Sequence, residues 1–497
     1  MELTFQKTNF DCLRQILWQT HNEEQTQELK LPDAYPDIGR VLCTWGQVMI
    51  RSKQWNTGGM TASGGVMVWV LYAPEDGSEP RSVETWIPFQ MRWDFPETER
   101  DGTIRLHCLL RSADSRSISA RKLMVRVCVS VLGEALEPTS MEMGVPREVP
   151  EDVQLLRKSY PVRLPKEAGE KVFQMDEELP LSASEAEKIM YYTMEPAVHD
   201  RKVLADKVVF RGTARVHILY RTPENMLKAW DGEIPFSQYT ELGREYGPDA
   251  TASVVPLVTG VELEQTDQGA MRLKGNISGQ YVIYATDTIE LVEDAYSPRR
   301  EVTVQTGELS MPALLDSCQQ TMHMDQSAQM DIGKIVDVSF YTEHPATVKD
   351  GMNVQLSVPG QFQLLYQDAD SRLQCALQRV DSTWNLECGD GCCVNSSARI
   401  SGRPEAAISP DGAAMQCDVF VDATVSMQQG LDMVQGLQLG QLQEQDPARP
   451  SLILKRAGEQ TLWDIAKECG STVETIRQAN RLADEAQPEQ MLLIPVL

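Results

Sequence analysis

The chain has 497 residues, of which 42% are hydrophobic and 24% charged, and its formal net charge is −26. This length has room for about three or four domains that each bury their own core. The acidic balance, without a basic cluster, excludes nucleic acid as a partner and excludes charge-driven binding to an anionic membrane.

No segment of the sequence predicts export or membrane insertion. The first ten residues lack the apolar core of a secretory signal. The longest apolar run, Val66–Tyr72, is far shorter than the ~20 residues of a transmembrane helix. The eleven cysteines, an odd number without paired spacing, are typical of a reducing compartment. We therefore expect a cytoplasmic protein.

The N-terminal segment, residues 1–30, is expected to form a lead-in to the first domain. Leu13, Ile16 and Leu17 follow helical spacing there and indicate a short helix. The phrase Leu31-Pro32 then opens the first domain, because proline cannot donate to a β-ladder and should end an edge strand or begin a loop.

A nine-residue pattern occurs three times and divides the chain into repeats. Its copies are Gly64–Tyr72, Gly212–Tyr220 and Val358–Tyr366, and their closing tyrosines stand 148 and 146 positions apart. Thirty-one positions before each tyrosine stands a branched aliphatic residue; the three are Val41, Ile189 and Ile335. Such a period is too long for a solenoid unit of about 20–50 residues, so the sequence predicts three tandem domains.

The repeated pattern is typical of a half-buried β-strand. In its second and third copies apolar and polar residues alternate, with Ile218 and Leu364 on the apolar face. In the first copy Met67, Trp69 and Leu71 make the other face apolar too, so we expect a neighbouring domain or the N-terminal lead-in to cover it. Turn signals before the strands predict hairpins; they are Gly58-Gly59, Asp206-Lys207 and Asp350-Gly351.

The rest of each repeat is also strand-rich, so we expect all-β domains of sandwich or barrel type. Proline- and charge-rich stretches bound the repeats at residues 31–150, 165–297 and 305–437. The third repeat is divergent. Its Met311-Pro312 begins 24 residues before Ile335, whereas the Leu-Pro pairs of the first two repeats begin 10 residues before their aliphatic residues. The difference indicates an insertion of 14 residues. Residues 438–451 are predicted to be a linker, which if flexible spans an r.m.s. distance of ~20 Å.

Residues 452–497 differ in character and predict a small β-α-α-β module. Leu452–Lys455 and Leu492–Pro495 are expected to be its strands. Between them, apolar residues at helical spacing begin at Leu462 and again at Val473, and predict two amphipathic helices.

The sequence also marks where these two helices begin and where the first one ends. Thr461 with Asp464, and Ser471 with Glu474, have the spacing of a capping box, in which each side chain bonds the other residue's backbone amide. Gly470 suits the left-handed conformation that ends a helix. The module is therefore predicted with both of its helices capped.

These segments resemble two known domain families. The run Gly458–Ala466, with Thr472-Val473, Ile476, Asn480 and Leu493–Pro495, is similar to a LysM domain over the whole module. The repeats resemble the SPOCS domain of clostridial sporulation proteins through Leu31-Pro32, Asp37-Ile38, Ile218–Tyr220 and Ile234–Phe236. The expected fold is thus mostly β, with three tandem all-β SPOCS-like domains followed by a small βααβ LysM domain. This order resembles that of SipL-like spore-coat morphogenetic proteins.

The resemblance implies a non-enzymatic scaffold of endospore coat assembly, located in the mother cell at the forespore surface. Its LysM domain would bind the coat ATPase SpoIVA and tether the coat to the forespore, with other coat proteins as further partners. The alternative is a cell-wall protein that binds peptidoglycan or chitin-like glycans, which is the default for a LysM domain considered alone. A hydrolase within the β repeats is a third hypothesis, for which the sequence nominates no residue.

The LysM resemblance implies a ligand groove between two loops. Its lips would be formed by Gly458, Glu459, Gln460, Thr461 and Leu462 on one side and by Asn480, Arg481 and Leu482 on the other. Loop backbone amides suit N-acetyl groups or an inserted peptide. Gln460 adds one residue to the usual Gly-Asp-Thr-Leu pattern, which disfavours glycan binding more than protein binding. Trp463 is either a core anchor or a contact for a protein partner.

The sequence carries no recognisable catalytic or cofactor motif. It lacks the P-loop, dinucleotide-binding, zincin and nucleophile-elbow patterns, so we expect neither enzyme activity nor a cofactor. The one cysteine cluster is Cys388, Cys392 and Cys393, with Cys375 and Cys417 as candidates for a second ligand pair. We interpret the cluster as a reduced loop rather than a metal site. His217, on the polar face of its strand, is expected to be solvated.

Overall fold

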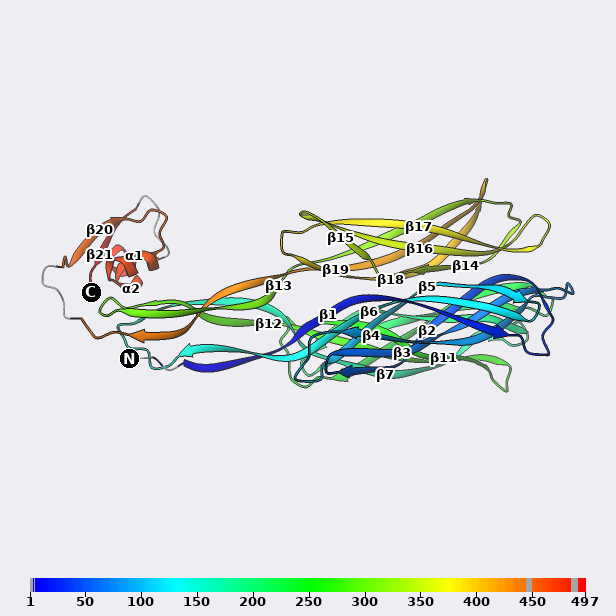
Figure 1. Ribbon diagram of the computed structural model, residues 1–497, viewed down its shortest axis with the longest axis horizontal. Coiled ribbons are helices and arrows are strands. Elements are labelled where there is room, and N and C mark those ends of the chain that lie inside the picture. Colours follow the sequence, from blue (N-terminus) through cyan, green and yellow to red (C-terminus); the bar gives the residue numbers. More distant parts are fainter. Residues whose placement is uncertain (1–2, 4, 444–448, 484–489) are drawn as a thin grey trace.

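The computed structural model describes residues 3, 5–443, 449–483 and 490–497. Strands make up about 75% of the chain and helices about 3%, which confirms the mostly-β fold class. Figure 1 shows an elongated molecule: a broad bundle of strands narrows into a stalk, and a small helical module lies at the end of the stalk.

The first repeat comprises six strands in two antiparallel sheets. The strands are β1 (Phe5–Lys30), β2 (Ile38–Asn56), β3 (Gly59–Pro74), β4 (Arg81–Asp94), β5 (Thr103–Ser119) and β6 (Lys122–Pro146). One sheet is the meander β2-β3-β4, and the other has the order β1-β6-β5. Apolar side chains of both sheets form one buried core between them, so the expected sandwich is confirmed.

The second repeat has the same plan. Its strands are β7 (Gln154–Ser182), β8 (Lys188–Leu204), β9 (Lys207–Arg221), β10 (Leu227–Glu241), β11 (Thr251–Gln265) and β12 (Ala270–Tyr296). They form the sheets β8-β9-β10 and β7-β12-β11. Each strand therefore occupies the position of its counterpart in the first repeat.

The third repeat differs by one break in a strand. Its strands are β13 (Val302–Gln329), β14 (Lys334–Thr342), β15 (Ala346–Asp350), β16 (Asn353–Gln367), β17 (Leu373–Glu387), β18 (Cys393–Ser409) and β19 (Gly412–Leu439). β14 and β15 both pair with β16 and together replace the single second strand of the other repeats. The divergence of this repeat is thus expressed as an interruption around His344.

The repeated pattern marks the central strand of the first sheet in every repeat. The tyrosines that close it pair directly with the aliphatic residues thirty-one positions earlier, in the pairs Val41–Tyr72, Ile189–Tyr220 and Ile335–Tyr366. A register shift follows each aliphatic residue, before Cys43, Tyr191 and Asp337. A bulge re-aims the side chains beside it. These three residues lie where the repeats meet.

All three predicted hairpins are confirmed. Asn56 pairs with Gly59, Leu204 with Lys207, and Asp350 with Asn353, so tight turns join the strands at the expected positions. The prolines of the corresponding Leu-Pro and Met-Pro pairs agree with the prediction only in part, because Pro312 does not end its strand. Pro180 and Pro312 lie in β7 and β13, the edge strands of their sheets, and Pro32 lies in the loop after β1.

The helix expected in the lead-in is wrong. Residues 5–30 form β1, which pairs with β6 over its whole length and belongs to the first repeat's own sheet. Three apolar residues at helical spacing stabilise a helix less than the ladder of backbone hydrogen bonds with β6 stabilises the strand. The proposed repeat starts at 31, 165 and 305 consequently fall after β1, inside β7 and inside β13, and the proposed end at 437 falls inside β19. The loops between repeats lie at residues 147–153 and 297–301.

The insertion inferred for the third repeat is also wrong. Met311-Pro312 lies in the middle of β13, while the equivalent Leu-Pro phrases lie at the ends of β1 and β7. The three strands have similar lengths of 26, 29 and 28 residues, so nothing has been added. The Leu-Pro and Met-Pro pairs are therefore similar in sequence but do not occupy equivalent positions in the three repeats.

The apolar second face of the first copy is covered, as expected, and the cover is the other repeats. Trp69 and Leu71 of β3 join a buried cluster with Tyr191 and Leu219 of the second repeat and Leu365 of the third. The indole of Trp69 lies 5.0 Å from the ring of Tyr192. Of the two proposed covers, neighbouring domains are therefore the correct one.

The centre of this interface is polar. Tyr191 stacks on Trp45 of the first repeat with ring centroids 4.1 Å apart, and its hydroxyl donates to Asp337 of the third repeat at 2.6 Å. The Asp337 side chain is only 3% exposed. Burying a carboxylate costs several kcal/mol unless charged and hydrogen-bonding partners compensate, so its partners define how the repeats fit together.

His217 is one of those partners, and the expectation that it is solvated is wrong. Its Nδ1 lies 2.7 Å from Asp231 and its Nε2 lies 3.1 Å from Asp337, with the imidazole 16% exposed. Burial lowers its pKa, but the two carboxylates outweigh burial and raise the pKa to about 10. The side chain is therefore an imidazolium that joins the second and third repeats.

Three pairs of long strands extend beyond the sandwiches and form the stalk (Figure 1). They are β1–β6, β7–β12 and β13–β19, one from each repeat. Two buried apolar clusters run along the stalk, and each draws residues from all three repeats; Met143, Ile289 and Leu431 belong to one, and Leu3, Val292 and Leu437 to the other. The stalk is thus held by side chains rather than by ladders between repeats.

Candidate functional site

The C-terminal module has the expected order of elements. It consists of β20 (Leu452–Arg456), α1 (Leu462–Cys469), α2 (Val473–Asn480) and β21 (Met491–Pro495), and β20 pairs antiparallel with β21. Residues 444–448 of the predicted linker, and residues 484–489 before β21, lie outside the described residues. The first two residues of that linker, Gln438 and Leu439, still belong to β19.

The caps of α1 are as the sequence predicts. Thr461 and Asp464 form a reciprocal capping box, and Gly470 ends the helix in the left-handed region at φ 65°. The start of α2 differs from the prediction, because Thr472 is its N-cap and accepts from the amide of Thr475. Ser471 is buried and its hydroxyl donates to the carbonyl of Pro495, which removes it from the helix terminus.

The first predicted lip is an exposed loop with one buried residue. Gly458, with φ 60°, and Glu459, Gln460 and Thr461 are exposed between β20 and α1. Leu462 is fully buried in the core of the module. Four of the five residues are therefore accessible to a ligand, and the fifth anchors the loop.

The second predicted lip contains one accessible residue. Arg481 is exposed at the left-handed end of α2, with φ 55°. Asn480 donates to the carbonyls of Ile476 and Leu493 and accepts from the amide of Leu493, so its side chain ties α2 to β21. Leu482 packs against the module core. Binding at the two lips remains a prediction, for which Arg481 is the second lip's candidate side chain.

Trp463 faces away from the loops and contacts the stalk. Its indole nitrogen donates to the carboxylate of Asp294, near the end of β12, at 2.8 Å. Its ring meets that of Tyr296 edge-on, with centroids 4.8 Å apart and planes at 78°. Trp463 is also packed against the core of its own module, as a core anchor would be. Its other contacts are with another domain of the same chain.

Two further bonds complete this junction. Lys467, one turn along α1, places Nζ 2.7 and 2.9 Å from the two carboxylate oxygens of Asp294. The hydroxyl of Tyr296 donates to the carbonyl of Ser471 at 3.0 Å. Burial raises the pKa of Asp294, but hydrogen bonds from Lys467 and Trp463 outweigh it and the pKa is lowered. Asp294 is thus an anion at neutral pH, bonded to two side chains of α1.

Sequence reasoning missed Asp294, Tyr296 and Lys467 as functional positions. Asp294 and Tyr296 lie about 170 positions from Trp463 and carry no motif. The weak signal was the half-apolar flank of α1, where an exposed tryptophan is costly unless another surface covers it. Only the folded stalk identifies that surface.

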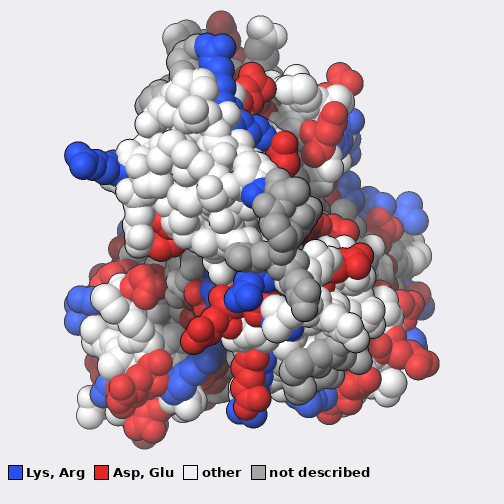
Figure 2. All heavy atoms as spheres, turned by 90° about the vertical axis from the view of Figure 1, so that its left-hand side faces the viewer, with Lys and Arg blue, Asp and Glu red and all other residues white. Residues whose placement is uncertain are grey.

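The outer face of the two-stranded sheet in the module is apolar. Leu452, Leu454 and Met491 are 47%, 66% and 57% exposed, and Leu454 pairs with Leu493. Figure 2 views the molecule from this end and shows a broad area without charged side chains in its upper half, where the module lies. On a chain with 72 acidic residues, an exposed apolar area of this kind makes the module a candidate surface for contact.

The cysteine cluster and the candidate further ligands are dispersed. Cys388 is buried and Cys393 exposed. Cys375 lies instead beside Cys43 of the first repeat, with the sulfur atoms 2.7 Å apart. Burial raises the pKa of Cys417 to about 12. Among the described residues, no group of three or more histidine, cysteine or acidic side chains is placed to hold a metal ion.

Comparison with known families identifies two domains. Residues 185–266 match the family model described as SipL, SPOCS domain, and residues 456–495 match the LysM domain model. The first match spans β8 to β11 of the second repeat, and the other repeats share its strand plan. No curated protein and no solved structure matches the chain. The architecture of SPOCS and LysM domains expected from the sequence is confirmed, and it suggests a protein related to the sporulation coat and to peptidoglycan binding.

Neither helix in the described part of the chain combines the length and the apolarity that crossing a membrane requires. Both helices belong to the LysM module and contain eight residues each.

Proposed function

We propose that the chain is a non-enzymatic scaffold of endospore coat assembly, in which the SPOCS-like repeats form a rigid body and the LysM module binds a protein partner. The partner we propose is SpoIVA, the coat ATPase, and the site of action is the forespore surface in the mother cell. Other coat proteins would bind the repeats. The observation that carries the proposal is the orientation of the module, whose α1 contacts the stalk while Gly458–Thr461 and Arg481 stay exposed.

The geometry supports presentation of a ligand site at one end of a long body. The stalk is built from strands of 26 to 29 residues, which at about 3.3 Å per residue extend well beyond a sandwich domain. The module lies at the stalk's end and its uncharged face points outward (Figure 2). A surface that is apolar and free of acidic side chains suits a protein interface, whose centre is depleted of charge.

The proposal is tested with the full chain immobilised on a sensor and offered SpoIVA or soluble muropeptides. We expect SpoIVA to bind and muropeptides to bind at least tenfold more weakly. Glu459→Ala and Arg481→Ala, both in exposed lips, should weaken the complex, while Arg379→Ala, an exposed arginine on β17, should not. Tight muropeptide binding without SpoIVA binding would support the alternative, a glycan-binding wall protein.

The absence of enzyme activity is part of the proposal and needs its own measurement. Incubated alone with ATP or with muropeptides, the purified chain should leave both intact, because any hydrolysis in the assembly would belong to the partner. Turnover of either compound by the chain alone would contradict the scaffold role.

A further inference from the structure

The three repeats meet through the same pair of strands in each case, but one of the three contacts is open. The second strand of one repeat faces the fifth strand of the next, and β2 packs on β11 while β14 packs on β5. Within the described residues the third pair, β8 and β18, does not pack to a comparable extent. Here arginines bridge the repeats, with Arg403 2.8 Å from Asp231 and Arg215 donating to the carbonyl of Gly402.

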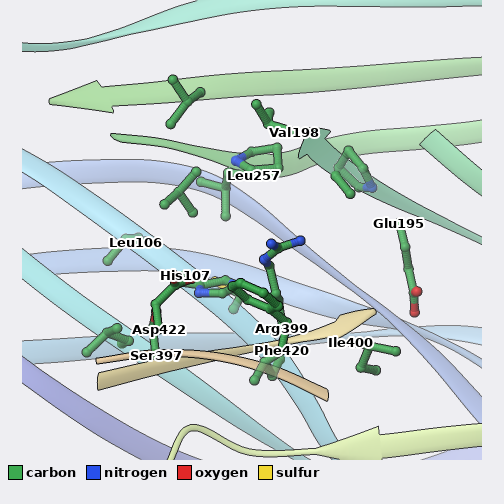
Figure 3. Close-up of a pocket in the computed structure, with 18 of the residues that line it drawn as sticks. Leu106, His107, Glu195, Val198, Leu257, Ser397, Arg399, Ile400, Phe420 and Asp422 are labelled. Atoms are coloured by element: carbon green, nitrogen blue, oxygen red, sulfur yellow. The ribbon is translucent and has the colours of Figure 1, made fainter. Parts of the chain in front are cut away.

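A cavity of about 1060 Å³ lies between the repeats at this open contact. Its walls come from all three repeats and include the apolar side chains of Leu106, Leu257, Val198, Ile400 and Phe420 (Figure 3). Ligand pockets in proteins have volumes of about 300–1,000 Å³ with mostly apolar walls and a few polar groups. This cavity has the size and the lining of such a pocket.

Arg399 is the polar group at the centre of the cavity. It extends from β18 toward Leu257 and Val198 (Figure 3), and its guanidinium stacks on the ring of Phe420 at 4.2 Å. No carboxylate oxygen of the described residues lies within ion-pair distance of it, whereas Arg105 in the same cavity is bonded to Glu134 at 2.6 Å. Burial lowers the pKa of Arg399, as expected for a cation that lacks full compensation.

The charges around Arg399 limit which anion it can accept. Asp422 lies in the same wall, and its carboxylate accepts from Gln319 at 2.7 Å. Burial raises the pKa of Asp422 despite the attraction of Arg399. The Asp422 carboxylate repels a dianion about twice as strongly as a monoanion. A single flat carboxylate also matches the fork of a guanidinium.

We propose that this cavity is a binding site for a monocarboxylate with an apolar body, held by Arg399 at its head and by the apolar walls along its length. The exposed side chains His199 and Arg201 lie at the rim, which gives the ligand a route from solvent. A ligand here would contact all three repeats and would stabilise their assembly, since anything that binds only the folded state does so. The proposal is independent of the LysM module.

The experiment is calorimetric titration of the full chain with octanoate. Octan-1-ol serves as the neutral counterpart with the same apolar chain. Inorganic phosphate serves as an anion that lacks an apolar chain. We expect octanoate to bind at one site and both controls to bind at least tenfold more weakly. Arg399→Gln should weaken octanoate binding by about 10–100-fold, the effect of losing a charge-assisted hydrogen bond, and leave octanol unchanged. Arg379→Gln, at an exposed arginine of the same repeat, should change neither.

A second variant keeps the test informative if Arg399→Gln alters the fold. Asp422→Asn removes the competing carboxylate, so octanoate should bind several-fold more tightly, an increase that damage to the structure would not produce. Absence of octanoate binding to the wild-type chain, or binding that Arg399→Gln does not weaken, would overturn the proposal. Equal binding of octanoate and octanol would overturn it as well, since Arg399 would then contribute nothing to binding.

Discussion

Asp337 at the centre of the repeats and Asp294 at the tip of the stalk both join separate parts of the chain, but they differ in burial. The Asp337 side chain is 3% exposed and is bonded by Tyr191 and His217. The Asp294 side chain is 27% exposed and is bonded by Trp463 and Lys467. A buried charge is costly once it loses a partner, whereas water can replace the partners of a half-exposed one.

The difference indicates that the contact between the repeats is permanent and that the contact between the LysM module and the stalk is reversible. Separating the repeats would expose a large apolar cluster and leave charged groups without partners. Separating the LysM module from the stalk would uncover chiefly Tyr296 and Trp463. We therefore expect the repeats to behave as one body, while the module can leave the stalk when a partner competes for α1.

The largest expected effect concerns His217. His217→Ala leaves the buried carboxylate of Asp337 without its cation, so the free energy of unfolding should fall by about 3–5 kcal/mol. Urea unfolding followed by circular dichroism measures it. The matched control is His323→Ala, because His323 also pairs with an aspartate at 2.7 Å but its side chain is 71% exposed. If the His217→Ala and His323→Ala chains unfold at the same urea concentration, the buried ion pair contributes no more to stability than the exposed one, and the comparison is refuted.

The same residue predicts how stability depends on pH. The pKa of His217 is raised to about 10 in the folded chain, above the value of about 6.5 in an unfolded one. Its contribution is therefore fully present below about pH 6.5 and is lost as pH rises through about 10. The wild-type melting temperature should fall more steeply than that of His217→Gln between pH 7 and pH 10. Because other groups titrate in this range, the difference between the two chains is the quantity to compare, and parallel curves would contradict the assignment.

A smaller effect is expected at the stalk junction. Trp463→Ala should weaken docking of the module by about 1–4 kcal/mol, as for an interface hot spot, and leave the module folded. Hydrogen exchange of α1 and of the end of β12 should accelerate, while circular dichroism of the isolated module stays unchanged. Unfolding of the module, at a cost of about 3–5 kcal/mol, would instead make Trp463 a core anchor.

Asp294→Ala is the companion variant for that junction, because it removes the same bond from the other side. It leaves the module sequence intact, so it should accelerate exchange at α1 without any change in the module's own stability. If Asp294→Ala leaves exchange unchanged, the module does not depend on this contact for its position.

The smallest effect on stability is expected in the exposed loop. Gln460→Ala should change the free energy of unfolding by no more than about 0.5 kcal/mol, as is usual for an exposed position. Its effect should appear in partner binding, measured on the same sensor as the wild type. A large loss of stability would show that the loop supports the module rather than a ligand.

The sequence by itself determined the repeat, the strands and the module. Alternation around Tyr72, Tyr220 and Tyr366 identified equivalent strands, and the aliphatic residue thirty-one positions earlier, such as Val41, proved to be the cross-strand partner of each tyrosine. The capping box at Thr461 located α1. These features depend on residues close together in the chain or on a pattern repeated along it, so local physics is sufficient to detect them.

Only the tertiary structure decided how the parts meet. The lead-in is a strand because it pairs with β6 along its length. His217 lies between two carboxylates from different repeats. The tertiary structure also placed Asp294 beside Trp463, and in a cavity between repeats it left Arg399 without an ion-pair partner among the described residues. Burial and charge pairing depend on neighbours that lie far apart in the sequence, and folding alone brings those neighbours together.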